Sequence, residues 1–392
     1  MRPLDGITVV TLEHAVAAPF ATRQLADLGA RVIKIERPGV GDFARAYDSR
    51  VDGMASYFVW INRSKESLTL DVKNPEAAKI LKQLVGQADV LVQNLGPGAA
   101  ARLGLSAEAL RPAHPGLIVC DISGYGKDGP YRDKKAYDIL IQAEAGLLSV
   151  TGTPEAPSRA GVSAADIAAG MYAYSNILAA LIQRGRTGKG SHIDVSMLEA
   201  LGEWMSNPMY YAYKGASPPP RAASSHPTIY PYGPFATGDG KTVLLGVQNE
   251  REWASFCSNV LLRPEVAVDE RFNSNVARNG NRAALKALIE DVFGTLDAAQ
   301  ITRRLDDAGI GNASMNSMNA FWEHPQLQAR DRWRSVDSPV GELPMLLPPG
   351  VNDSYDYRID PIPALGQHTD AILHELGYGD TDIGRLRDAG AI

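Results

Sequence analysis

Residues 7–36 read ITVVTLEHAVAAPFATRQLADLGARVIKIE, and this stretch decides the fold class. Residues 7–12 and 31–36 are short apolar runs of the kind that form buried strands. Between them, residues 19–28 favour a helix that Gly29 ends, because glycine accepts the left-handed backbone that commonly follows a helix. A strand, a helix and a second strand form a βαβ unit, so the sequence predicts a parallel sheet.

The same pattern continues up to about residue 200. Further strands are predicted at residues 68–72, 89–93, 117–122 and 192–197, with a helix at residues 75–86. Asn74 and Pro75 mark the start of that helix, because asparagine caps free N–H groups and proline suits the first helical turn. Alternating strands and helices are typical of a Rossmann-like, doubly wound α/β domain.

The length of 392 residues predicts two domains, since single cores seldom grow beyond roughly 250–300 residues. Residues 217–220 read SPPP, and further prolines follow, which disfavours regular structure. We expect a large domain over residues 1–200, a linker over 201–225, a small α+β domain over 226–325, and a segment over 326–392 that returns to the large domain. In the small domain we expect a strand at 242–247 and helices at 250–261, 281–293 and 297–308.

Composition excludes several classes of protein. The formal charge is −6 and no block of basic residues is present, so nucleic acid is not an expected partner. Only Cys120 and Cys257 occur, which predicts neither disulfides nor a metal site and favours a cytoplasmic protein without a signal peptide. Residues 164–182 approach the length of a membrane span, but they carry Asp166 and polar residues, so we expect a buried helix and no membrane.

Asp166 is the first candidate for chemistry. It stands at the start of an alanine-rich apolar run, residues 167–182, which predicts one long buried helix. The pattern Ser163-x-x-Asp166 fits a capping box, in which the two side chains satisfy free N–H groups at the helix start. The same place suits an anionic nucleophile, because the positive helix end keeps a carboxylate ionised. The residues alone leave both interpretations open.

Asp138 follows Tyr137 and precedes a second apolar run, residues 139–148, so it is either an N-cap residue or a second functional carboxylate. Three basic residues precede Asp138, namely Arg132, Lys134 and Lys135. Three more lie near the ends of predicted strands: Arg37, Lys73 and Arg102. Ligands of open α/β sheets gather at strand ends, so these cations together indicate a polyanionic ligand, although each alone fits an exposed surface charge.

Common cofactor motifs are missing. Residues 37–42 lack the Gly-x-Gly-x-x-Gly pattern of dinucleotide sites, and residues 185–191 lack the spacing of a phosphate-binding loop. No local histidine or cysteine pattern predicts a metal site. His226, within SHPTIYPY at residues 225–232, is either an exposed histidine or a group that lines a cleft between domains.

Several motifs in a common order resemble those of the family III coenzyme A transferases, which include formyl-CoA transferase, carnitine-CoA transferase and the α-methylacyl-CoA racemases. The resemblance runs nearly from end to end. It is carried by DLGARVIKIERP at residues 27–38, NRSKESL at 62–68, QNLGPG at 93–98 and TGKG at 187–190.

The resemblance assigns roles residue by residue. It places the nucleophilic aspartate of the transferases at Asp166 and the loop that contacts the CoA thioester at Val16 and Ala17. It implies CoA-binding positions at Arg37, Leu70, Lys73, Asn94, Arg102, Lys135 and Tyr137. CoA is then a substrate, bound in an interlocked homodimer without a permanent cofactor, and transfer passes through an aspartyl-CoA thioester.

Two departures from the family narrow the expected substrate. Residues 226–235 lack the glycine-rich loop of formyl-CoA transferase and look like those of members that act on short dicarboxylates: succinate, itaconate, mesaconate, malate, citramalate or glutarate. Succinyl-CoA is the expected donor, with Asp138, His226 and Arg221 as candidate substrate residues. The racemases carry a His-Asp pair where this chain has Tyr137-Asp138, so racemisation is the second hypothesis. A CoA-binding protein without chemistry and an NAD-dependent dehydrogenase are the remaining rivals.

Overall fold

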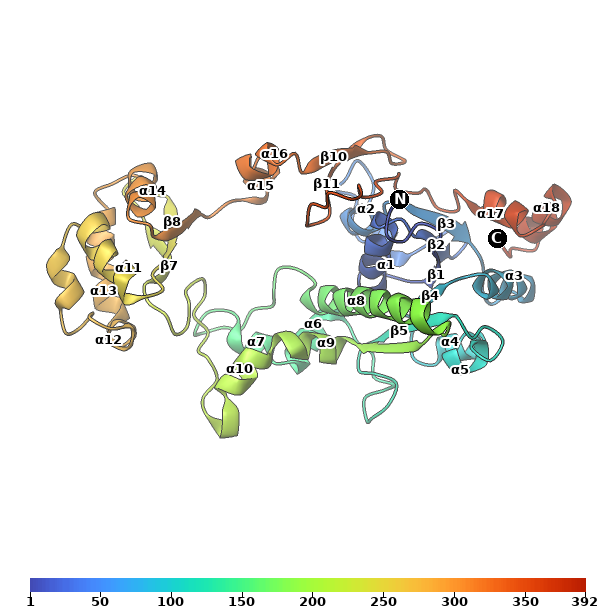
Figure 1. Ribbon diagram of the computed structural model, residues 1–392, viewed down its shortest axis with the longest axis horizontal. Helices are drawn as coiled ribbons and strands as arrows, with labels where there is room; N and C mark the ends of the chain where they lie inside the picture. The colour runs from blue at the N-terminus through green and yellow to red at the C-terminus, as the bar shows by residue number, and fades with distance from the viewer. The chain divides into compact units, whose positions relative to one another are not determined.

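A computed structural model describes residues 1–392, and the chain forms two compact units (Figure 1). The first unit consists of residues 1–146, 160–206 and 330–392. The second consists of residues 147–159 and 207–329.

The first unit is built on a six-stranded parallel sheet. Its strands are β1 (Thr8–Leu12), β2 (Arg31–Glu36), β3 (Lys65–Thr69), β4 (Val90–Gln93), β5 (Ile118–Ser123) and β6 (His192–Ser196). Their order across the sheet is β3-β2-β1-β4-β5-β6. From β1, the chain adds strands first on one side and then, starting with β4, on the other side. The predicted parallel α/β sheet is therefore confirmed, and β1 and β4 form the switch point at which open α/β sheets commonly bind ligands.

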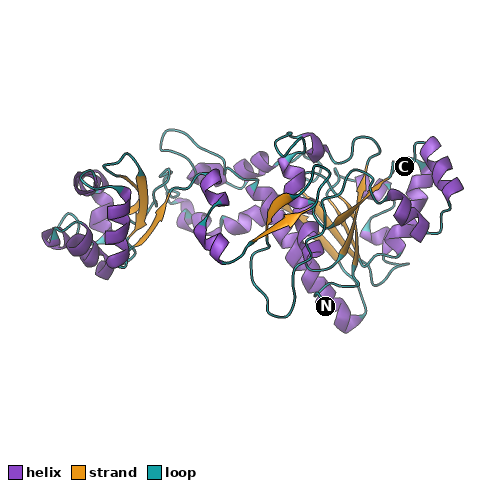
Figure 2. Ribbon diagram, turned by 90° about the horizontal axis from the view of Figure 1, so that it is seen from above, coloured by secondary structure: helices purple, strands orange, loops and turns teal.

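Helices cover both faces of this sheet (Figures 1 and 2). On one face, α1 (Ala17–Asp27) packs against α8 (Ala164–Thr187). On the other, α3 (Pro75–Gly86), α17 (Thr369–Glu375) and α18 (Asp380–Asp388) share a core with the strands. The remaining helices of this unit are a 3₁₀ turn at Phe43–Ala46, α2 (Ser56–Ile61), α4 (Ala99–Arg102), α5 (Ala107–Leu110), α6 (Asp138–Glu144) and α9 (Met197–Trp204). The helix expected at residues 75–86 is confirmed, with Asn74 as its N-cap.

Strand β3 begins at Lys65, three residues before the expected position. Lys65 and Ser67 are buried polar residues within it. An apolar pattern cannot reveal such positions, because their polar groups are satisfied by partners distant in the sequence.

Helix α8 is longer than expected, and one of its faces is exposed to solvent. Its small residues, among them Ala165, Ala169 and Ala173, face the unit, while Ile182 is 60% exposed. The expectation of a fully buried helix is wrong, because the run is apolar on both faces and only one packs within the chain. Its length and composition would also suit a membrane span, but core helices of soluble proteins meet the same criteria.

The C-terminal segment, residues 330–392, belongs to the first unit. It begins with an antiparallel hairpin of β10 (Trp333–Val336) and β11 (Leu343–Leu346). At the edge of the sheet, the Thr69 backbone N–H donates to the Thr369 hydroxyl at 3.0 Å. Ile372 and Leu386 then join the core beneath β3 and β2.

The second unit has a three-stranded antiparallel sheet in the order β7-β8-β9. Its elements are α7 (Leu147–Val150), a 3₁₀ turn at Tyr213–Gly215, β7 (Tyr232–Ala236), β8 (Thr242–Gly246), α11 (Glu250–Ser255), a π turn at Phe256–Val260, a 3₁₀ turn at Pro264–Val268, α12 (Asn275–Gly280), α13 (Arg282–Phe293), α14 (Ala298–Asp307), β9 (Gly311–Ser314), α15 (Met318–Trp322) and α16 (Pro325–Ala329), while α10 (Ser206–Tyr211) follows α9. Trp253, Phe256 and Phe293 lie in its core. The strand and helices expected here are confirmed, apart from the π turn that ends the first helix.

Candidate functional site

The carboxyl edge of the parallel sheet gathers most of the predicted CoA-binding residues. Arg37 follows β2, Leu70 and Lys73 follow β3, and Asn94 follows β4. Arg37, Lys73 and Arg102 are exposed, whereas Leu70 is buried. The fold thus places exposed cations on both sides of β1, which suits a dispersed polyanion such as the phosphates of CoA. Their contacts with CoA stay a prediction.

The turn from β1 into α1 occupies the centre of this edge. The Asn94 side chain accepts a hydrogen bond from the His14 N–H at 2.9 Å and donates one to the His14 carbonyl at 2.9 Å. Ala15 has the left-handed φ of 59°. Val16 is the N-cap of α1 and makes no side-chain cap hydrogen bond. Since a helix leaves its first N–H groups without intrahelical partners, the start of α1 offers donors to an oxyanion.

Asp166 lies in the first turn of α8 and is half-buried. Burial first, and the charge of Asp138 second, raise its pKa to about 7. The helix end therefore does not keep the pKa of this carboxylate low, because desolvation outweighs the macrodipole. A carboxylate that water solvates poorly is a stronger nucleophile when it does ionise.

The predicted capping box at the start of α8 does not form, because Ser163 makes no side-chain cap hydrogen bond. Asp138 supplies the cap instead: its Oδ1 accepts from the Ala165 N–H at 2.9 Å and its Oδ2 from the Gln142 amide at 2.7 Å. Asp138 is also not the N-cap of its own helix, α6. Tyr137 occupies the N-cap position, and Asp138 is the first residue of the helix. One carboxylate thus fixes the start of the helix that carries the other.

Helix α8 approaches the start of α1 one turn after Asp166. A Cβ added at Gly170 would lie 2.7 Å from the Ala17 carbonyl oxygen and 3.0 Å from the Phe20 ring. Only glycine fits such a close approach without displacement of a helix. The fold therefore brings the predicted nucleophile and the predicted thioester-contacting residues Val16 and Ala17 into one region of the first unit.

A buried ionic cluster of Glu13, Lys34, Asp42 and Lys65 lies beneath this turn, and the sequence did not predict it. Lys34 Nζ donates to Asp42 Oδ2 at 2.7 Å, and Lys65 Nζ donates to Glu13 Oε1 at 2.6 Å. Burial alone would raise the pKa of Glu13, but the two lysines lower it to about 2. Burial lowers the pKa of Lys65 to about 8 despite Glu13. The only signal in the sequence is a charged residue within one apolar strand, Lys34, and another just after the strand before it, Glu13.

Comparison with known proteins identifies the family. The model of CoA-transferase family III matches residues 4–369. The chain belongs to this family. It is 34% identical to the succinyl-CoA:glutarate CoA-transferase of Homo sapiens, over all of this chain and 90% of that protein. It is 35% identical to the succinate–glutarate CoA-transferase of Agrobacterium fabrum, over 95% and 96% of the two chains.

The fold of this family III CoA-transferase matches that of a solved relative. A crystal structure of a CAIB/BAIF family protein from Brucella suis superimposes with a TM-score of 0.84 at 36% identity, covering 96% of this chain and 99% of that one. The predicted family and enzyme class are thus confirmed. The relatives named here are transferases, so the racemase hypothesis is not favoured.

Lys135 and Tyr137 lie in the connection between β5 and α6. Both are exposed, Tyr137 at 66%. The neighbouring Lys134 binds Glu144 and lies 4.2 Å from the centre of the Tyr131 ring, which fixes that end of the connection. The transferase therefore leaves Lys135 and Tyr137 accessible to a ligand, and their roles stay predictions.

His226 and Arg221 belong to the second unit. His226 Nδ1 accepts from the Ile229 N–H at 3.0 Å, and its ring stacks on Tyr232 with centres 5.2 Å apart. The Arg221 guanidinium donates to the carbonyls of Thr153 and Pro154 at 2.8 and 2.9 Å. Both side chains form hydrogen bonds with nearby backbone. Substrate could be bound only by the polar atoms of His226 and Arg221 that these hydrogen bonds do not use.

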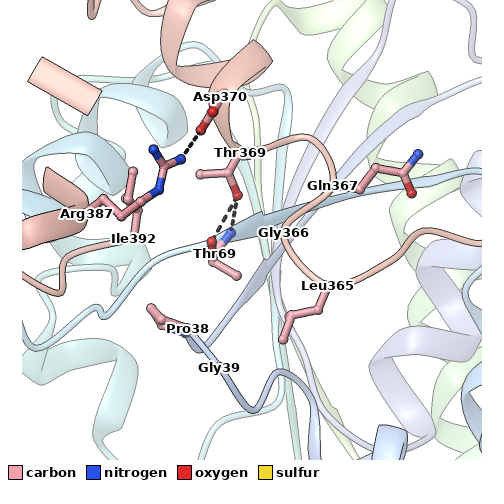
Figure 3. Close-up of a pocket in the computed structure, with 10 residues that line it drawn as sticks. All are labelled: Pro38, Gly39, Thr69, Leu365, Gly366, Gln367, Thr369, Asp370, Arg387 and Ile392. Atoms are coloured by element: carbon pink, nitrogen blue, oxygen red, sulfur yellow. Dashed lines mark hydrogen bonds and ion pairs between the residues drawn. The ribbon is translucent and has the colours of Figure 1, made fainter. Parts of the chain in front are cut away.

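A cavity of about 430 Å³ lies at the carboxyl ends of β2 and β3 (Figure 3). It is lined by Pro38, Gly39, Thr69 and the C-terminal segment. Its cation, Arg387, is paired with Asp370 at 2.6 Å (Figure 3). The cavity contains neither predicted carboxylate and so is not the place of the transfer chemistry. No group of histidine, cysteine and acidic residues is arranged to hold a metal ion.

Proposed function

We propose that this transferase moves CoA from succinyl-CoA to a short dicarboxylic acid, with glutarate as the first acceptor to test. The observation that carries the proposal is the half-buried Asp166, which lies one turn of α8 before Gly170, the residue that packs against the start of α1. Succinyl-CoA is named for the human relative and for relatives that act on D-citramalate, L-malate and mesaconate. These acceptors share a second carboxylate, which supports a dicarboxylate as the substrate class.

In the first half of the proposed reaction, the ionised Asp166 attacks the thioester carbonyl of succinyl-CoA. The C–S bond breaks, which gives a succinyl-aspartyl anhydride and CoA thiolate. The thiolate then attacks the aspartyl carbonyl, so that succinate leaves and an aspartyl-CoA thioester remains. Each step exchanges one acyl bond for another, and no proton, oxidant or cofactor is consumed.

In the second half, a carboxylate of the acceptor attacks the aspartyl-CoA thioester and releases CoA thiolate. The thiolate attacks the acceptor carbonyl of the new anhydride, which forms the product thioester and restores Asp166. The N–H groups at the start of α1 would stabilise the oxyanion that each attack generates. Exclusion of water protects the anhydrides from hydrolysis.

Asp166→Ala and Asp166→Asn test the nucleophile. We expect both variants to bind CoA with affinity near that of the wild type and to lose transfer, because they remove the attacking oxygen and leave the cations at the sheet edge in place. The assay is the conversion of succinyl-CoA and each dicarboxylate to a new CoA thioester, followed by chromatography. Transfer at the wild-type rate in Asp166→Ala would refute the proposal.

We further propose that the protein is a homodimer. The outer face of α8 supports this, since Met171 is 38% and Ile182 60% exposed in the isolated chain. Large apolar side chains in one exposed stripe are typical of an interface. Sedimentation equilibrium should give twice the chain mass, and a monomer at micromolar concentration would contradict this part of the proposal.

A further inference from the structure

The turn between β1 and α1 is held in a conformation that its sequence does not favour. Ala15 adopts φ 59° although it is not glycine. A side chain makes this region unfavourable, so such a residue persists only where its surroundings fix it. The residues after Ala15 are Val16, the N-cap, and Ala17, the first residue of α1.

Asp42 makes the contact that fixes Ala15. Its Oδ1 accepts from the Ala15 N–H at 3.1 Å and from the Ala44 N–H at 2.9 Å. Its Oδ2 accepts from Lys34 Nζ at 2.7 Å. Both oxygens are therefore in use, and the Asp42 side chain is completely buried.

The ionic cluster anchors Asp42 to three strands and to α1. Lys34 also contacts Glu13 at 3.3 Å, and Lys65 donates to Glu13 and to the Pro19 carbonyl in the first turn of α1, the latter at 3.0 Å. Buried ion pairs add little net stability compared with apolar residues of similar size. We infer that these four charged residues are present because together they fix the position of the β1–α1 turn relative to the sheet.

We propose that Asp42 is a positioning residue that holds Ala15 in the left-handed conformation and so aims the first N–H groups of α1 at the thioester oxygen during transfer. The inference rests on the reaction proposed above. Asp42 touches no reacting atom, and it acts through the backbone of the turn. Its loss should therefore lower kcat and leave CoA affinity nearly unchanged.

Asp42→Asn is the first test. An amide replaces one carboxylate oxygen by an NH2 donor, which would face either the backbone N–H groups or Lys34, so one of these sides loses its acceptor. We expect kcat for transfer from succinyl-CoA to fall about tenfold or more, because a misplaced oxyanion donor weakens stabilisation of the transition state. The dissociation constant for CoA, measured by calorimetry, should change less than about threefold.

Asp27→Asn is the matched control. Asp27 is also a buried carboxylate in an ion pair, with Arg63 at 2.8 Å, but it lies at the opposite end of α1. We expect this variant to lower Tm without lowering kcat of the folded enzyme. An equal loss of kcat in both variants, or an unchanged kcat in Asp42→Asn, would overturn the inference.

Substitutions at Ala15 test the backbone directly and apply even if Asp42→Asn does not fold. Ala15→Val should lower kcat with the ionic cluster intact, because a β-branched side chain opposes positive φ. Ala15→Gly should restore several-fold activity when added to Asp42→Asn, since glycine accepts this φ without a partner. Absence of both effects would contradict the inference.

Amide hydrogen exchange separates this inference from the proposed function. Asp42→Asn should speed exchange in the peptide that covers residues 13–20, and Asp27→Asn should not. This readout does not depend on the substrates. If the wild type transfers no CoA, the proposed function fails, while unchanged exchange in Asp42→Asn would refute the role of Asp42 by itself.

Discussion

Asp166→Asn should stabilise the CoA-free protein at alkaline pH. The folded chain raises the pKa of Asp166 from the ordinary value of 3.8 to about 7, chiefly through burial. A raised carboxyl pKa favours folding only while the group is protonated, so this contribution is present below pH 3.8 and is lost as the pH rises through 7. Above pH 7, the ionised side chain opposes folding by up to about 4 kcal/mol, from 1.36 kcal/mol per pKa unit.

The neutral amide removes this opposition and keeps the shape of the side chain. The gain in free energy of unfolding should therefore be up to about 4 kcal/mol at pH 8 and roughly 3 kcal/mol smaller at pH 5. Urea denaturation of both proteins at the two pH values measures it. Asp353→Asn is the control, because Asp353 is exposed in a C-terminal loop and should show no such pH dependence. A gain that is absent, or equal at both pH values, would refute the account of Asp166.

Three further predictions concern neighbouring residues. Asp138→Ala should lower the free energy of unfolding by about 1 kcal/mol, because it removes the side chain that caps the Ala165 N–H. Asp138→Asn keeps an acceptor and should lower it less. Equal losses in thermal unfolding of the two variants would contradict the capping role. Gly170→Val should lower both Tm and kcat by separating α8 from α1, and wild-type values for both would contradict the close approach. Arg37→Ala should raise KM for succinyl-CoA about tenfold with little change in kcat, and the difference should shrink at high salt; a fall in kcat alone would exclude a binding role.

The parallel sheet could be predicted from the sequence because its central strands are continuous apolar runs. Helices cover both faces of a doubly wound sheet, so both sides of each central strand must be apolar. It missed the start of β3, because Lys65 is buried with a charge partner, Glu13, that lies 52 residues away. It also misjudged α8. An alanine-rich run indicates a helix, but it does not reveal whether the second apolar face meets the same chain.

The local environment of the candidate site was less predictable than its residues. Ser163 and Asp166 fit a capping box by spacing, yet Asp138 occupies the cap from another helix. The pKa of Asp166 depends on this burial and on that neighbour, and neither follows from local sequence. The support of Ala15 by Asp42 likewise depends on how the turns after β1 and β2 meet, which only the fold establishes.

Trapping the covalent intermediate tests most directly whether Asp166 is the nucleophile. The enzyme is incubated with succinyl-CoA, treated with hydroxylamine and digested, and its peptides are sequenced by mass spectrometry. Covalent transfer through Asp166 predicts a hydroxamate at Asp166 that requires succinyl-CoA and disappears when glutarate is added in excess. A hydroxamate at another acid, or transfer without any modification of Asp166, would contradict it.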